Sequence, residues 1–411
     1  MSATIFTNAR ILDGRVDGGI EGHVLVEGGT IREVSDKPIA SSTARTIDLK
    51  GRTLMPGLID AHVHVIASEV NLARHALLPD AVVAFRAAKI MNAMLMRGFT
   101  TIRDLGGATQ GLRQARDEAH FDAPRMVICG KALSATGGHS DGRGRYDSRD
   151  MAYLEARLGC LGRIADGVDA VRRACREEIK AGADYIKIMA NGGVASPTDP
   201  IAFLGYSKDE IRAAVEEAEM AQTYVAAHLY TDQAIDRAVE CGVWSLEHCN
   251  LIEEKTARKA AAAGAIACPT LVTYEYLKIE GASLGLGAES VAKIDTVRLA
   301  GLESLEKMQR AGLTMAFGTD LLGEMHRHQS EEFVIRGRVL PAMEVIRSTT
   351  VHAAKLLRME GKIGTIAPGA FADLVVVEGD PLADLSLLTG QGKHLSAIMQ
   401  DGRFIKDAMA A

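Results

Sequence analysis

At 411 residues, the chain exceeds the roughly 250 to 300 residues at which a single hydrophobic core usually stops growing, which predicts a large core with an added subdomain. Its 47 lysines and arginines nearly balance its 53 aspartates and glutamates without any basic run, so nucleic acid and acidic membrane surfaces are excluded as expected partners. Six scattered cysteines without a C-x-x-C pair, no signal-peptide pattern at the N-terminus and no apolar run of about 18 residues predict a reduced, cytoplasmic protein that does not span a membrane.

The two ends of the chain are rich in short β-type runs. Residues 1–55 alternate such runs with glycine-rich turns such as Glu27-Gly28-Gly29. Residues 363–411 have the same character, with Gly379-Asp380-Pro381 as a turn. Neither end holds enough strands for a stable core of its own. We therefore predict that the two ends pair into one small β-sandwich domain.

Between the ends, residues 56–362 alternate strand-like with helix-like segments, the pattern of βα units on a parallel sheet. The helix-like segments are alanine-rich and amphipathic, and Ser207 followed by Glu210 predicts a capping box at the start of one of them. Eight strands over roughly 300 residues match the size of a (β/α)8 TIM barrel, a fold of the α/β class. The eight strand-like segments are residues 58–64, 100–106, 125–130, 185–190, 224–229, 245–249, 265–271 and 314–320.

Ionisable side chains gather at the carboxyl ends of these segments, where a barrel of this kind places its active site. His62 and His64 lie two residues apart on the first segment, so a strand turns both imidazoles to the same side. This pair suits a divalent metal ion, although satisfied core histidines are an alternative. The other candidates are Lys187 on the fourth segment, His228 on the fifth, His248 on the sixth and Asp320 on the eighth, where a helix N-cap is the alternative for Asp320.

Lys187 lies inside the apolar run Tyr185-Ile186-Lys187-Ile188-Met189, where an unpaired ammonium would cost several kcal/mol. Burial lowers the pKa of a lysine, and the neutral amine reacts with carbon dioxide to give a carbamate whose two oxygens can bridge two metal ions. A lysine that reaches the rim or pairs with a carboxylate is an alternative. A Schiff-base lysine of an aldolase is another, but that chemistry has no need of four histidines at neighbouring strand ends.

Three motifs resemble the metal-dependent amidohydrolase superfamily, and the resemblance covers nearly the whole chain. Residues 56–64 are similar to its entry motif, Gly318-Thr319-Asp320 to its final-strand motif, and residues 364–377 to the return into its β-sandwich. The resemblance implies two divalent metal ions. His62, His64 and Asp320 would hold one ion and His228 and His248 the other, with carboxylated Lys187 and a hydroxide bridging them. These donors suit zinc, and cobalt, manganese or iron would also fit.

Shorter motifs resemble the Xaa-Pro dipeptidase-like and ochratoxinase-like branch of that superfamily. They are Ser134-Ala135-Thr136-Gly137-Gly138-His139, Asn191-Gly192-Gly193 and Ala227-His228-Leu229-Tyr230. The branch implies cleavage of the amide or peptide bond to a C-terminal amino acid with a free carboxylate, in dipeptides, N-acyl amino acids or ochratoxin-like amino acid amides. It also implies that His139 and Tyr230 bind this carboxylate, although a rim tyrosine and a loop hydrogen bond are their alternatives. Related enzymes form symmetric assemblies, so a homo-oligomer is expected, with an octamer among the candidates.

The predicted mechanism follows from metal chemistry. Two cations lower the pKa of a shared water from about 15.7 toward about 7, and Asp320 accepts its proton and delivers it to the leaving amine. A cyclic-amide hydrolase or deaminase on the same scaffold is the alternative, but such deaminases commonly lack the lysine found here at position 187. A non-catalytic scaffold is disfavoured because all six predicted ligand positions are filled.

Overall fold

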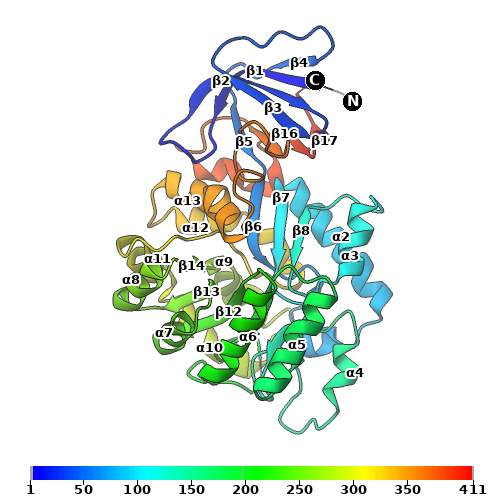
Figure 1. Cartoon of the computed structure of the whole chain (residues 1–411), viewed down its shortest axis with the longest axis vertical. Helices are drawn as coiled ribbons and strands as arrows, with labels where there is room; N and C mark the ends of the chain where they lie inside the picture. The colour runs from blue at the N-terminus through cyan, green and yellow to red at the C-terminus, as the bar shows by residue number, and fades with distance from the viewer. Residues whose placement is uncertain (1–2, 197, 410–411) are drawn as a thin grey trace.

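Strands from both ends of the chain form one sheet in the computed structural model, which describes residues 3–196 and 198–409 (Figure 1). The strand order is β17-β16-β15-β5-β1-β2-β3, and β4 pairs with β1. Strand β5 is parallel to β1 and antiparallel to β15, with Leu374 opposite Pro56, so the two chain ends join there. The strands are β1 (Ala3–Ile11), β2 (Ile20–Glu27), β3 (Thr30–Ser35), β4 (Arg45–Asp48), β5 (Thr53–Pro56), β15 (Leu374–Val377), β16 (Leu395–Gln400) and β17 (Arg403–Asp407).

The predicted pairing of the two chain ends is therefore confirmed. The strands belong to a single hydrogen-bonded sheet, whereas the sequence predicted a sandwich of two. Alternate apolar side chains from both ends, among them Phe6, Val26, Leu54 and Val376, pack into a core that is separate from the main one. Strands far apart in this order approach one another across the core, since Phe6 of β1 packs on Phe404 of β17 and Arg45 of β4 pairs with Asp407 of β17.

The central part of the chain contains parallel strands in two sheets. All neighbouring strands within these sheets are parallel, as the alternation of strand and helix predicted. Seven of the eight predicted strands are present, and β9 and β10 are additional short ones. The first sheet holds β6 (Leu58–Val63), β7 (Phe99–Asp104) and β8 (Arg125–Ile128); the second holds β10 (Gly162–Ile164), β9 (Ala132–Ser134), β11 (Ile186–Met189), β12 (Val225–Thr231), β13 (Ser245–Leu251) and β14 (Ile266–Cys268).

The eighth predicted strand, residues 314–320, makes backbone contacts with both sheets but forms only an isolated bridge, Ala267 with Met315. The Ala267 N–H donates to the Thr314 carbonyl at 2.9 Å, and the Ala61 N–H donates to the Phe317 carbonyl at 2.8 Å. On the other side, the Asp184 N–H donates to the Ile128 carbonyl of β8 at 2.7 Å. The two parallel sheets are thus linked at both edges by main-chain hydrogen bonds.

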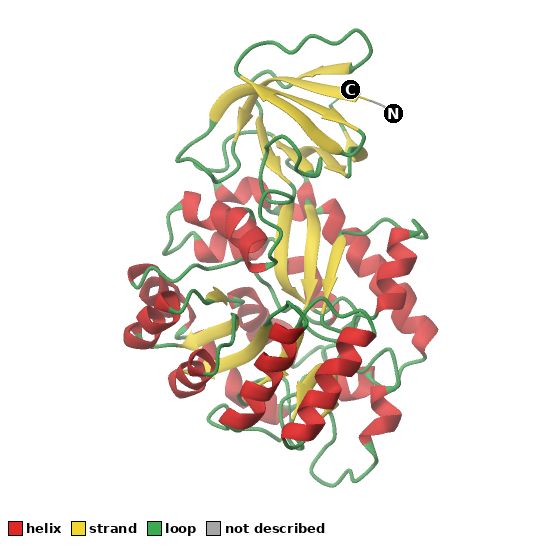
Figure 2. Cartoon of the chain, viewed as in Figure 1, coloured by secondary structure: helices red, strands yellow, loops and turns green. Residues whose placement is uncertain are grey.

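Helices lie around the parallel strands, as Figure 2 shows in red around yellow. The predicted capping box is confirmed at the start of α6, where the Ser207 and Glu210 side chains each accept from the other's backbone N–H. The α-helices are α1 (Leu72–His75), α2 (Asp80–Met96), α3 (Gln110–Asp117), α4 (Met151–Glu155), α5 (Val168–Lys180), α6 (Lys208–Met220), α7 (Asp232–Glu240), α8 (Glu254–Ala262), α9 (Leu271–Tyr276), α10 (Ala288–Arg298), α11 (Gly301–Arg310), α12 (Glu331–Arg336), α13 (Ala342–Thr349) and α14 (Val351–Leu356).

The six cysteines are all buried and unpaired, as their scattered positions predicted. Among the helices of residues 3–196 and 198–409, none is long and apolar enough to cross a lipid bilayer. The main hydrophobic core packs between the parallel strands and the helices and includes Ile102, Ile188, Leu246 and Phe317. This core fixes the strands whose carboxyl ends carry the ionisable side chains.

Candidate metal centre

Three of the predicted ligands meet where the first and eighth predicted strands end. His62 Nε2 lies 3.4 Å from Asp320 Oδ1, and His64 Nε2 lies 3.2 Å from the same oxygen. His248 Nδ1 lies 4.0 Å from Asp320 Oδ2. One ligand atom from each of His62, His248 and Asp320 fits within 4.8 Å of the others, a spacing compatible with one shared metal ion.

His228 and His248 approach from the neighbouring strands β12 and β13. Their ring centroids are 4.6 Å apart, and His248 lies 4.8 Å from the ring of His62. His248 and Asp320 both adopt left-handed backbone conformations, with φ of 71° and 53°. Non-glycine residues rarely adopt such angles, and strain of this kind is typical of functional sites.

Lys187 extends from β11 into the same cluster and is fully buried. It forms no ion pair with any carboxylate of the described residues, so the predicted alternative of a lysine neutralised in that way does not apply. Burial lowers the pKa of Lys187, although the charges of Glu247 and Asp320 act in the opposite direction. A lowered pKa favours the neutral amine from which a carbamate can form.

Each of the four clustered histidines uses one ring nitrogen in a hydrogen bond to the protein. His62 Nδ1 bonds to Glu247 at 2.8 Å, His64 Nδ1 donates to the Gly106 carbonyl at 3.2 Å, and His228 Nε2 donates to the Gly192 carbonyl at 3.2 Å. His248 Nδ1 shares a hydrogen bond with the Thr270 hydroxyl at 2.8 Å. Such partners fix the orientation of a metal-binding imidazole and leave its other nitrogen for the metal. The donor set therefore fits divalent metal ions.

Glu247 and Arg103 support this cluster, and sequence reasoning missed both roles. Glu247 Oε2 accepts from His62 at 2.8 Å, and Oε1 accepts from Arg103 at 2.8 Å. Both side chains are fully buried. Burial opposes ionisation of Glu247, but Arg103 and His62 hold its pKa well below the usual range. An acidic residue inside the apolar segment 245–249 was an available signal of the same kind as Lys187.

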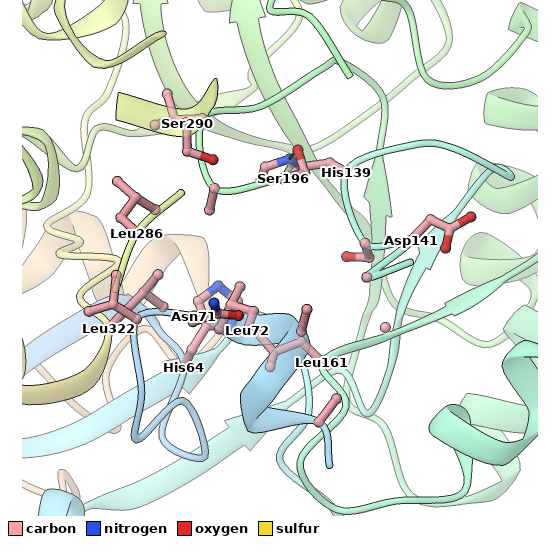
Figure 3. Close-up of a pocket in the computed structure, with 18 of the residues that line it drawn as sticks. His64, Asn71, Leu72, His139, Asp141, Leu161, Ser196, Leu286, Ser290 and Leu322 are labelled. Atoms are coloured by element: carbon pink, nitrogen blue, oxygen red, sulfur yellow. Dashed lines mark hydrogen bonds between the residues drawn. The ribbon is translucent and has the colours of Figure 1, made fainter. Parts of the chain in front are cut away.

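A cavity of about 550 Å³ adjoins the cluster, and its lining includes all eight residues predicted for the site. His139 stacks on His228 with ring centroids 4.2 Å apart, and its Nδ1 lies 2.8 Å from Ser196 Oγ. Figure 3 shows Ser196 beside His139, with His64 across the open space from both. Leucines from four separate segments share the lining: Leu72, Leu161, Leu286 and Leu322.

Tyr230 reaches the cluster from β12. Its hydroxyl forms a 2.8 Å hydrogen bond with the Tyr274 hydroxyl, which lies 3.0 Å from His248 Nδ1. Tyr230 is buried, so the alternative of an exposed rim residue does not apply. Tyr274 was not predicted, because a tyrosine in the apolar run at the start of α9 gives no signal beyond packing.

The chain is similar to known proteins over most of its length. Residues 53–403 match the amidohydrolase family. The chain is 30% identical to ochratoxinase from Aspergillus niger over 368 residues, which cover 86% of this chain and 75% of that one. A solved amidohydrolase structure is 53% identical with a TM-score of 0.97, each chain being covered to 99%. A solved prolidase in complex with N-methylphosphonate-L-proline is 49% identical with a TM-score of 0.97, covering 99% of this chain and 100% of the other.

Proposed function

This chain belongs to the amidohydrolase family and hydrolyses amide or peptide bonds, and from this premise we propose that its substrates end in an amino acid with a free carboxylate. The observation that carries the proposal is the convergence of four histidines, Lys187 and Asp320 in the lining of a single cavity. Dipeptides, N-acyl amino acids and ochratoxin-like amino acid amides are the substrate classes proposed. The similarity to a prolidase that binds a phosphonate of L-proline and to an ochratoxinase supports them.

The proposal includes two divalent metal ions, with zinc as the preferred metal. His62, His64 and Asp320 would hold one, and His228 and His248 the other, with N-carboxylated Lys187 shared between them. When bound, the ions supply Lewis acidity that lowers the pKa of water and polarises the scissile carbonyl. The free ring nitrogens of the histidines and the unpaired, buried Lys187 support this assignment.

Asp320 is the proposed proton carrier. Burial opposes its ionisation, but His62 and His64 lower the pKa of Asp320 well below the usual range for an aspartate. An ionised carboxylate at this place accepts the proton of the attacking water and returns it to the leaving amine nitrogen. His139 and Tyr230 would bind the carboxylate of the released amino acid, since both line the cavity beside His228.

The same proposal covers the architecture around the site. The two linked parallel sheets would form one closed (β/α)8 barrel over residues 56–362, flanked by a domain from residues 1–55 and 363–411. A homo-oligomer, an octamer among the candidates, is also part of the proposal. Its substrate is a small molecule or dipeptide rather than a nucleic acid or a membrane.

A cyclic-amide hydrolase or deaminase on the same scaffold is the alternative. The position of Lys187 among the histidines disfavours a deaminase. The test is a hydrolysis screen of dipeptides and N-acyl amino acids varied on the carboxyl side, with cyclic amides and amino-purines as the competing set and bound metal quantified in parallel. Release of a free amino acid supports the proposal; ammonia release or ring opening alone would contradict it.

A further inference from the structure

Lys293 on α10 binds three main-chain carbonyls of one loop. Its Nζ donates to the carbonyls of Gly193 at 2.5 Å, Ser196 at 2.7 Å and Asp199 at 3.1 Å. An ammonium has three N–H donors, so the loop between β11 and α6 takes all of them. Within the described residues, no carboxylate forms an ion pair with Lys293. The three hydrogen bonds of its ammonium therefore all go to the loop, while the Glu289 carboxylate on the same helix also acts on its charge.

The residues that Lys293 holds are those that orient His139. The Gly193 N–H donates to Asp199 Oδ2 at 2.8 Å, and this oxygen lies 3.3 Å from His139 Nδ1. The Ser196 hydroxyl is hydrogen-bonded to Asp199 and lies 2.8 Å from the same His139 nitrogen. Each of the three carbonyls bound by Lys293 thus belongs to a residue that touches His139 or fixes its partner.

Gly193 also provides the surface on which His139 packs. A Cβ at position 193 would lie 1.8 Å from His139 Cε1, far inside any real contact distance. The imidazole therefore rests directly on the Gly193 backbone on one side, and it stacks with His228 at a centroid distance of 4.2 Å. Because the loop binds Nδ1, the remaining nitrogen, Nε2, is the one available to a ligand in the cavity.

We infer that Lys293 is a positioning residue, which clamps the loop of Gly193, Ser196 and Asp199 so that His139 presents Nε2 to the substrate. The expected effect of Lys293 on turnover rests on the proposed function, because the role of His139 in substrate binding belongs to that proposal. The expected effect of Lys293 on the orientation of His139 does not depend on the proposed function.

The first test measures His139 without any substrate. Diethyl pyrocarbonate modifies accessible imidazole nitrogens, and mass spectrometry follows each histidine separately in the metal-loaded protein. In Lys293→Met, the freed loop should release Nδ1 and raise the modification rate of His139 several-fold. Exposed His120 serves as the internal reference and should not change. Lys307→Met, which removes a surface-paired lysine from the neighbouring α11, should leave His139 at the wild-type rate. An unchanged rate in Lys293→Met would overturn the inference.

The second test is a double-mutant cycle on the hydrolysed N-acyl amino acid. Lys293→Met and Gly193→Ala should each raise KM roughly tenfold with a smaller change in kcat and no loss of bound metal. If Lys293 acts through His139, Lys293→Met should add nothing in a His139→Ala background. If the effects of Lys293→Met and His139→Ala on KM multiply instead, Lys293 does not act through His139. The positioning role is then refuted, and only a general role in stability remains. If no amide in the screen is hydrolysed, the proposed function fails, and the modification rates still decide the inference.

Discussion

Glu247 accepts a hydrogen bond from His62 Nδ1 at 2.8 Å, and its other carboxylate oxygen binds Arg103. One buried carboxylate therefore sets the direction in which His62, a predicted metal ligand, presents its free nitrogen. The three side chains come from three different strands, β6, β7 and β13. Among residues outside the predicted ligands, Glu247 is therefore the position at which a substitution best tests how a ligand is oriented.

Glu247→Gln should lower metal affinity by about 10- to 100-fold, the usual effect of losing a hydrogen-bond partner behind a ligand. The change also leaves Arg103 without its counter-charge, which costs about 3 to 5 kcal/mol of stability. Glu332→Gln is the matched control, because Glu332 forms an equally buried pair with Arg336 at 2.7 Å. Competition titrations with a metal chelator should separate them: similar affinities in both variants would contradict the role of Glu247.

Asp320→Asn should retain the metal ions but lose turnover by about 10² to 10⁴, the range typical of general acid-base groups. The amide is close in shape to the carboxylate and keeps an oxygen for coordination, but it cannot carry the proton. Single-turnover rates measured beside elemental analysis distinguish a chemical defect from metal loss. A variant with near-normal kcat would remove Asp320 from the mechanism.

Lys187→Ala should lose bound metal, because the variant has no amine from which a bridging carbamate can form. Elemental analysis of purified protein is the measurement. Lys131→Ala is the control, since Lys131 is partly buried and its side chain binds only the main-chain carbonyls of Arg157 and Cys160. If Lys187→Ala still contains two metal ions per chain, the assignment of Lys187 as a metal ligand is refuted.

His326 should make the protein less stable as the pH falls. Burial lowers the pKa of His326 to about 3, while an unfolded histidine titrates near 6.5. Between these values the unfolded state binds a proton that the folded state does not, so stability falls by up to about 1.4 kcal/mol per pH unit below about 6.5.

In His326→Gln, the amide can still donate to the Ala67 carbonyl that His326 Nε2 contacts at 3.1 Å, but it does not titrate. From about pH 6.5 to 5, the wild type should therefore lose about 1.6 kcal/mol more unfolding free energy than the variant. Urea denaturation of both metal-free proteins at the two pH values is the check. Equal losses would show that His326 is protonated in the folded state.

Many residues of the candidate site could be predicted because their residue types are unusual in the segments where they occur. A lysine in an apolar strand and histidines at strand ends are visible in the sequence without any knowledge of contacts, and the cavity brings them together. The resemblance to amidohydrolases is confirmed by the family match over residues 53–403. The pairing of the chain ends was predictable because neither end carries enough strands alone.

The supporting residues could not be predicted in the same way. Arg103 and Glu247 are 144 positions apart, and no local spacing connects them. Lys293 lies on an ordinary helix and acts only through main-chain carbonyls, which the sequence does not distinguish. Strands β9 and β10 have three residues each, too short for a periodic pattern to emerge. The single end-to-end sheet depends on β5 pairing with both β1 and β15, a tertiary arrangement.

The position of β5 between β1 and β15 has a consequence for how the protein is made. Strand β5 runs through Gly57 directly into β6, and the Gly57 N–H donates to the Asp373 carbonyl just before β15. The main-chain contact that holds the start of β6, the strand of His62, therefore cannot form until β15, some 300 residues later in the chain, has emerged from the ribosome. A nascent chain released before residue 374 would carry every histidine of the cluster but would lack the strand that anchors the first of them, so metal acquisition should follow the synthesis of β15.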